Sequence, residues 1–206
     1  MTELMVAIFL RAIHSGTRLR DRKKPVVVTV PVNLRNYFPS ESARNFFATI
    51  NVGYNFCKGD DSLEAVLAEV KRSFQENLTE ERMRAQMNGL CALEHSLPLR
   101  LVPLPLKDVI LRMANWLAAR SVTASFSNVG KVSMPRETEK LIRLFSVFTS
   151  AGMLQACACS FGEEYVISFA TPFRNFEMER IFFRELAQMG IKIVLTTNLP
   201  SEQEED

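Results

Sequence analysis

Apolar and polar positions follow their clearest pattern near the end of the chain, over residues 165–189. A β-type run covers residues 165–169, and Pro172 ends it because proline has no amide hydrogen to donate to a sheet. The next apolar residues recur at spacings of four, four and three, which places them on one face of a helix. They are Met178, Phe182, Leu186 and Met189. The pattern predicts a strand, a short loop and a helix, and the loop contains no His, Asp, Cys or Lys.

The first third of the chain predicts a buried helix followed by two strands. Helical spacing of apolar residues begins at once and predicts a helix over 2–14. The β-branched run 25–32 is typical of a strand covered on both faces, and a second strand is expected at about 46–56. Asp61 is then a suitable N-cap for another helix, with Glu64 as its capping-box partner.

The remaining elements are expected to complete a sheet and its covering helices. Thr79 can cap a further helix, with Met83, Met87 and Leu90 facing inward, and a third helix is expected over 106–119. Its apolar residues, Leu106, Val109, Ile110, Met113 and Leu117, are expected to face the core. Further strands are expected at 122–126, 141–149, 153–161 and 191–196, with a tight hairpin connection at 161–164.

This order of elements predicts an α/β (α+β) fold, a two-layer sandwich of a mixed β-sheet with helices packed on it. We expect one domain over 1–206. Within it, 1–24 form the N-terminal helix and a basic connection, and 197–206 form an acidic tail.

Composition narrows the possible functions. A net charge of +2 gives no global electrostatic footprint for nucleic acid, and the apolar runs are too short to predict a membrane span. The four cysteines are scattered, which favours a reducing compartment and a cytoplasmic location. Cys157 and Cys159 share a face of a predicted strand, and core packing is favoured there over a metal site. The basic run 18–24 is interpreted as a solvated connection, with anion binding as the alternative.

Few side chains offer chemistry. Arg35 and Arg44 flank a long connection between two strands, where they either hold the loop or meet an anionic ligand. The stretch 127–130 predicts a bend or bulge whose polar groups either make the turn or polarise a carbonyl. His14 and His95 lie at predicted helix ends and are interpreted as caps or surface residues.

Three segments together resemble a known family. The segments VPVNLRNYFPSESARNFF, SFSNVGKVSMP and VISFATPFRNFEMERIFF are similar to the C-terminal half of the chloramphenicol-acetyltransferase-like superfamily. This superfamily includes CoA-dependent acyltransferases, alcohol acetyltransferases and peptide-synthetase condensation domains. The resemblance runs in order from about residue 3 to 196 and implies one lobe of a two-lobe enzyme.

The resemblance also implies where chemistry takes place. In the family, one lobe carries HHxxxDG at a strand-to-helix turn, and its second histidine is the general base. The matching turn here is about 170–176, where Thr171 replaces the histidine and Asn175 the aspartate. The resemblance therefore implies no catalytic residue in this chain. It implies a lining of the substrate channel by Asn33, Arg35, Arg44, Asn45, Ser127, Asn128 and Gly130.

The expected function is accordingly half of an enzyme. The chain is expected to be the C-terminal half of an acyltransferase that uses acyl-CoA or a carrier thioester and resembles an alcohol O-acetyltransferase. It is expected to be inactive alone, because it lacks the lobe with the HHxxxDG motif. We expect no tightly bound cofactor, with acyl-CoA as the donor substrate of the full enzyme. The expected partner is an N-terminal lobe or a second copy in a homodimer. The alternative is a non-catalytic binding or assembly module built on a degenerate lobe.

Overall fold

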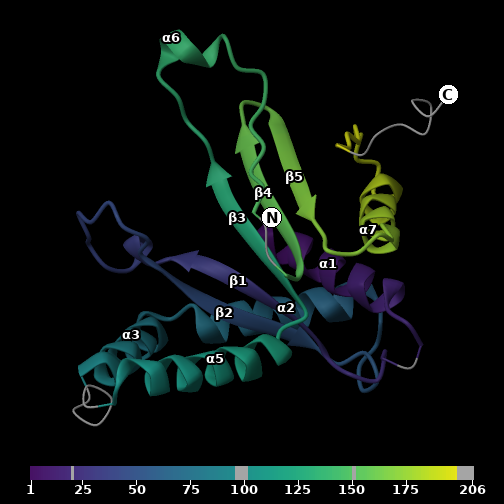
Figure 1. Cartoon of the computed structure of the whole chain (residues 1–206). Helices are drawn as coiled ribbons and strands as arrows, with labels where there is room; N and C mark the ends of the chain where they lie inside the picture. The colour runs from purple at the N-terminus through teal and green to yellow at the C-terminus, as the bar shows by residue number, and fades with distance from the viewer. Residues whose placement is uncertain (20, 96–101, 150–151, 199–206) are drawn as a thin grey trace, which may run out of the picture.

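A computed structural model describes residues 1–19, 21–95, 102–149 and 152–198. Its centre is a five-stranded sheet in the order β2-β1-β3-β4-β5 (Figure 1). Strands β1, β3 and β4 run parallel, and β2 and β5 are antiparallel to their neighbours. The strands are β1 (Val26–Asn33), β2 (Phe47–Tyr54), β3 (Ala124–Lys131), β4 (Leu154–Phe161) and β5 (Glu164–Ala170). The predicted α/β class with a mixed sheet is confirmed.

The sheet divides into two parts between β1 and β3. These strands pair only where Val28 and Thr29 meet Ala124 and Ser125. Beyond this contact they diverge, as Figure 1 shows, and the rest of β3 pairs with β4 alone. Over most of its length, the edge of β3 that faces β1 therefore has no neighbouring strand among the described residues.

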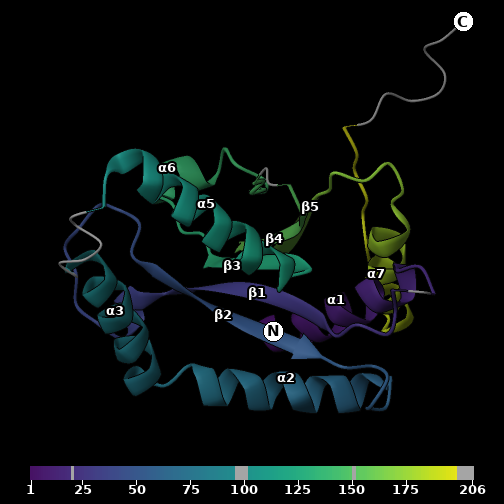
Figure 2. The same ribbon diagram turned by 60° about the horizontal axis from the view of Figure 1, so that its bottom comes forward.

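Helices α1 (Thr2–Gly16), α2 (Leu63–Asn77) and α7 (Glu177–Gln188) pack together on one face of the sheet (Figure 2). Helix α1 is apolar nearly all round, and its residues from Met5 to Leu10 are at most 3% exposed. A helix without a polar face is expected to be enclosed, and α1 lies at the centre of the core. The predicted buried N-terminal helix is confirmed.

Helices α1 and α7 are held close together by a small residue and an ion pair. A Cβ atom at Gly16 would lie 2.6 Å from Cγ of Met178, so a larger residue at this position would force the Met178 side chain to move. At the other end of the contact, Arg11 donates to Glu185 at 3.0 Å and to the carbonyl of Asp61 at 2.8 Å. One arginine thus joins α1 to α7 and to the loop before α2.

Two helix starts were predicted with different success. The hydroxyl of Thr79 accepts from the amide of Arg82 at the start of α3 (Glu80–His95), as predicted, and Met83 is buried. The predicted cap at Asp61 is wrong, because the N-cap of α2 is Ser62, which accepts from the amide of Ala65. The side chain of Asp60 in turn accepts from the amide and hydroxyl of Ser62, which fixes this start one residue later.

Helix α5 (Leu104–Arg120) forms as predicted but does not bury its apolar face. The prediction that these residues face the core is wrong, since those expected to be inward are between 43% and 60% exposed. Figure 2 shows α5 on the outside of the molecule, apart from the face that α1, α2 and α7 cover. Among the described helices, none is long and apolar enough to cross a membrane.

The strands predicted at 141–149 and 191–196 are also wrong. Both segments are described up to these bounds and neither forms a ladder with another strand. The first follows the short helix α6 (Arg136–Glu139) and contacts β4, where the Cys159 thiol donates to the carbonyl of Phe145 at 3.2 Å. This contact helps to bury Cys157 and Cys159, whose predicted role in core packing is confirmed. High β-propensity forms a strand only where a sheet edge accepts it.

Candidate functional site

The candidate residues lie at two opposite ends of the strands of the sheet. Asn33 ends β1 and Gly130 lies near the end of β3, and these parallel strands point toward the same edge. Ala170, which precedes the loop to α7, pairs instead with Gln155 at the start of β4. The structure thus places the candidate residues of 33–45 and of 127–130 at the carboxyl end of the parallel strands, on two strands that diverge. Thr171 and Asn175 lie at the opposite end.

Arg35 holds the connection between β1 and β2 in place. Its amide donates to the side chain of Asn33 at 3.0 Å, within the short helix η1 (Leu34–Asn36) and its cap. Its guanidinium donates to the carbonyls of Ser42 at 2.6 Å and Arg44 at 2.8 Å and lies 5.9 Å from the ring centre of Phe46. The loop is therefore closed by Arg35, while the side chains of Arg44 and Asn45 are exposed at its surface.

Asn128 builds the predicted bulge and anchors the start of α1. The pairing of β3 with β4 shifts register between Asn128 and Gly130, and Gly130 has a φ of 82°. Asn128 accepts from the amide of Gly130 at 2.9 Å and donates to the hydroxyl of Thr2 at 2.8 Å. Glycine is favoured at this φ because other residues adopt the left-handed region only with strain. The neighbouring Ser127 is half-buried on the same strand.

The turn before α7 uses its polar side chains for its own backbone. The hydroxyl of Thr171 accepts from the amide of Phe173 at 3.2 Å, and the side chain of Asn175 accepts from the amide of Glu177 at 3.0 Å. Both contacts stabilise the entry to the helix. Neither side chain can accept a proton near neutral pH, so the turn has the geometry of a strand-to-helix connection without a general base.

A buried carboxylate near this turn was not foreseen. Glu179 lies in the first turn of α7 and is 8% exposed, and its Oε1 has no partner among the described residues. Burial raises the pKa of Glu179 above the usual carboxyl range. The sequence offered a weak signal, because Glu179 is three residues before Phe182 on the inward side of the helix. From sequence alone, a charged residue at this position is interpreted as facing solvent, because the packing around the helix is not known.

Replacing Glu179 with methionine is expected to raise the free energy of unfolding by about 1 kcal/mol at neutral pH, because the buried carboxylate has no compensating contact. The raised pKa of Glu179 means that the wild-type chain loses stability as pH rises from the ordinary carboxyl pKa to the folded-state value. The gain in the variant should therefore shrink toward acid pH. Urea unfolding at several pH values measures this, and a gain independent of pH would contradict it.

His14 was predicted to be either a helix cap or a surface residue, and the structure shows that its side chain does not cap the helix. Its ring stacks on Phe56 with 4.1 Å between centres, and its Nδ1 is buried without a partner among the described residues. Burial, and secondarily the charge of Arg22, lower the pKa of His14. An aromatic stack without a hydrogen-bonded carboxylate or nucleophile is a packing arrangement. His95 is exposed at the end of α3, in agreement with its predicted surface position.

The basic connection is engaged in local contacts where it is described. Arg22 donates to the carbonyls of Thr17 at 3.0 Å and Ser15 at 2.5 Å, and Lys24 lies 3.8 Å from Asp21. These bonds secure the end of α1 to the start of the sheet. They support the predicted reading of a solvated connection, and the same run contains Arg20, which lies outside the described residues.

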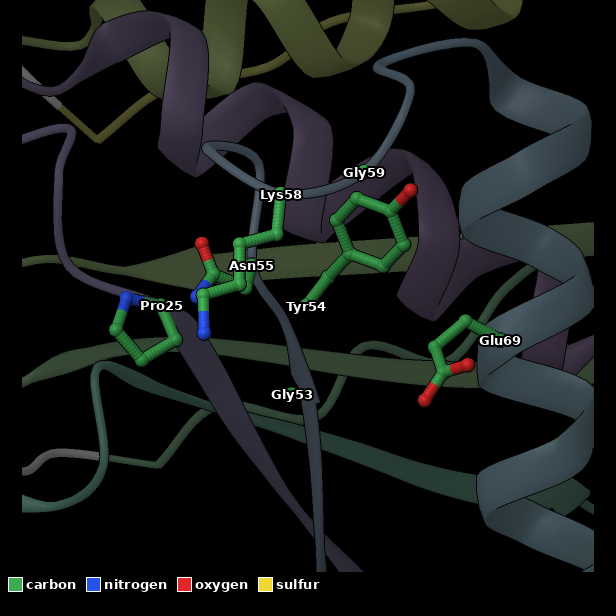
Figure 3. A pocket seen from close by; sticks show the side chains of 7 residues that line it. All are labelled: Pro25, Gly53, Tyr54, Asn55, Lys58, Gly59 and Glu69. Atoms are coloured by element: carbon green, nitrogen blue, oxygen red, sulfur yellow. The ribbon is translucent and has the colours of Figure 1, made fainter.

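A surface depression of about 420 Å³ lies elsewhere, at the end of β2 (Figure 3). Figure 3 shows Lys58 on one side and Glu69 from α2 on the other, with the Tyr54 ring between them. The Tyr54 hydroxyl is engaged, since it donates to the carbonyl of Asp60 at 2.6 Å. The depression also contains Pro25, which precedes β1, so it lies at the edge opposite Asn33. It does not coincide with the predicted channel residues.

Comparison with known proteins gives a structural likeness. The sequence matches no family model and no curated protein. The structure is similar to that of trichothecene 15-O-acetyltransferase from Fusarium sporotrichioides, with a TM-score of 0.51 at 15% sequence identity. The alignment covers 88% of this chain and 40% of that chain. At this identity the likeness shows the fold alone: the chain has an acyltransferase-like fold and spans 40% of its neighbour's length.

Proposed function

We propose that this chain is the C-terminal lobe of an acyltransferase that moves an acyl group from CoA or a carrier thioester to an alcohol or amine. The observation that carries the proposal is an acyltransferase-like fold whose turn at 170–176 contains no general base. A second lobe, which carries the HHxxxDG motif, would supply that base. Alone, the chain is expected to be inactive.

The channel residues take different parts in this proposal. Arg35 and Asn128 position the 33–46 loop and the β3 bulge through the bonds described above. Arg44 and Asn45 are exposed on that loop, where a cation and an amide are available to an anionic donor such as CoA. Ser127 and Gly130 belong to the part of β3 that has no neighbouring strand on the side of β1 among the residues that the structure describes. Both groups point to the carboxyl edge of the parallel strands as the side that the second lobe completes.

The segment 141–149 supports the idea of a covering partner. It has the composition of a strand but no ladder partner, and Leu141 and Phe148 are 84% and 67% exposed. Exposed apolar groups of this kind are commonly covered by another surface. We propose the complementary lobe as the partner, with a second copy of the chain as the other arrangement that would cover the segment. A non-catalytic assembly module remains the second function, favoured by the engagement of Thr171 and Asn175 in local turns.

The proposal is tested first with the chain alone. Acetyl-CoA hydrolysis and transfer are followed by thiol release and by chromatography of the products with a panel of alcohols and amines. The expected result is turnover equal to the buffer control, because no residue of the turn can accept the acceptor's proton. Turnover above that background, lost on replacing His14 or His95, would overturn the assignment of an empty catalytic turn.

A further inference from the structure

Helix α5 presents an apolar stripe that nothing in the described chain covers. One side of the helix carries residues spaced three and four apart, and each is at least 43% exposed. They are Leu106, Val109, Ile110, Met113, Trp116 and Leu117. Figures 1 and 2 both show α5 at the outside of the molecule. We call these six residues the α5 stripe.

Cations accompany the stripe. At 3.6 residues per turn, Lys107 and Arg112 flank it on its two sides, and Arg120 continues it at the C-terminal end. The guanidinium of Arg120 lies 3.5 Å above the centre of the Trp116 ring. The one acidic residue of the helix, Asp108, lies on the opposite side together with Leu111. The face that carries the stripe is therefore apolar in its middle and positive at its margins.

The distribution of apolar and charged residues on α5 indicates what kind of surface binds the stripe. In a two-fold antiparallel pairing of α5 with its copy, the centre of the stripe would lie near residue 112 and the two Arg112 side chains would stand side by side. Like charges at that position oppose the pairing, and no acidic residue borders the stripe to offset them. The stripe fits an anionic lipid bilayer better than it fits a second copy of α5. The acyl chains of the bilayer can take up the apolar residues, and its negative headgroups can meet the flanking cations.

We propose that α5 is a membrane-surface helix that inserts its stripe into the interface of an anionic bilayer. The helix lies in the plane of the membrane with Met113 and Val109 among the acyl chains. Trp116 lies at the headgroup level, where its amphipathic ring is favoured, and Arg112 and Arg120 contact lipid phosphates. The inference does not depend on acyl transfer.

The single tryptophan of the chain, Trp116, reports directly on insertion. The full chain is mixed with vesicles of phosphatidylcholine containing about one third phosphatidylserine, and its emission spectrum is recorded. The expected result is a blue shift and quenching by brominated acyl chains, with weaker binding to pure phosphatidylcholine and at high salt. Arg112→Gln is expected to lower partitioning onto the anionic vesicles about fivefold and to have little effect on the neutral ones.

Matched variants separate the stripe from the rest of the helix. Met113→Asp, on the stripe, is expected to abolish the vesicle-induced shift, whereas Leu111→Asp, similarly exposed on the opposite side, retains it. Both side chains are exposed, so circular dichroism is expected to show a folded chain in each case. An emission spectrum unmoved by vesicles, or equal loss in both variants, would overturn the proposal. So would a dimer in light scattering that Met113→Asp dissociates, because the stripe would then bind a second copy.

Discussion

Replacing Phe9 by alanine is expected to lower the free energy of unfolding by about 3–5 kcal/mol. Phe9 is fully buried in α1, and its ring centre lies 6.1 Å from that of Phe126, 5.8 Å from Phe169 and 6.2 Å from Phe182. These rings come from β3, β5 and α7, so one side chain joins three elements. Truncation removes their common contact and leaves a cavity that rigid neighbours cannot close.

The change is measured by urea unfolding followed by far-ultraviolet circular dichroism. Phe173→Ala is the matched control, because Phe173 is 53% exposed in the loop before α7 and its loss should cost no more than about 0.5 kcal/mol. A cost for Phe9→Ala close to that of the control would contradict the central position of α1. A large decrease in the urea dependence of the free energy would indicate that the unfolding is no longer two-state.

Replacing Arg11 by methionine is expected to cost about 1–3 kcal/mol at neutral pH. The variant keeps an unbranched apolar stem but removes the 3.0 Å ion pair with Glu185 and the 2.8 Å bond to the carbonyl of Asp61. Glu185 is 16% exposed, so its carboxylate would remain in a largely dry environment without its cation. That orphaned charge, more than the lost attraction, determines the cost.

The effect of pH checks this reason. Burial already raises the pKa of Glu185, and Arg11 opposes that shift. Without Arg11 the pKa of Glu185 should rise further, so the penalty is full above that raised folded-state pKa. The part caused by the orphaned charge disappears as pH falls below the ordinary carboxyl value, and the part caused by the lost bond to the Asp61 carbonyl remains. Arg180→Met is the control, since Arg180 pairs with Glu177 on the surface and its loss should cost at most about 0.5 kcal/mol. Equal costs for both variants at every pH would contradict the interpretation.

Local patterns predicted the elements whose partners are close by or whose faces are unambiguous. The apolar run in α1, the β-branched residues of β1 and the hairpin from β4 to β5 each needed only their own sequence. Helix α5 was predicted with the wrong environment, because spacing tells which side chains share a face but not what that face meets. The segments 141–149 and 191–196 failed for a related reason: a strand requires a free sheet edge, which local sequence does not specify.

In the candidate site too, local contacts could be predicted from the sequence and contacts between distant segments could not. The turn residues Thr171 and Asn175 and the bulge at Gly130 were predictable, since their contacts reach only two residues along the chain. The bond between Asn128 and Thr2 was not, because it joins residues 126 positions apart. Glu179 was missed because its burial depends on how α7 packs. Sequence thus predicts which polar groups build their own turn and fails for those that tertiary packing encloses.

Acyl transfer by this chain when it is joined to an HHxxxDG-bearing lobe is the most direct test of the account. The measurement is product formation from acetyl-CoA and a panel of alcohols and amines, with the chain alone and the joined protein compared. The account predicts no transfer by the chain alone, and transfer by the joined protein that is lost when the second histidine of the motif is replaced by alanine. Transfer by the chain alone, or its absence from a correctly folded joined protein, would contradict the account.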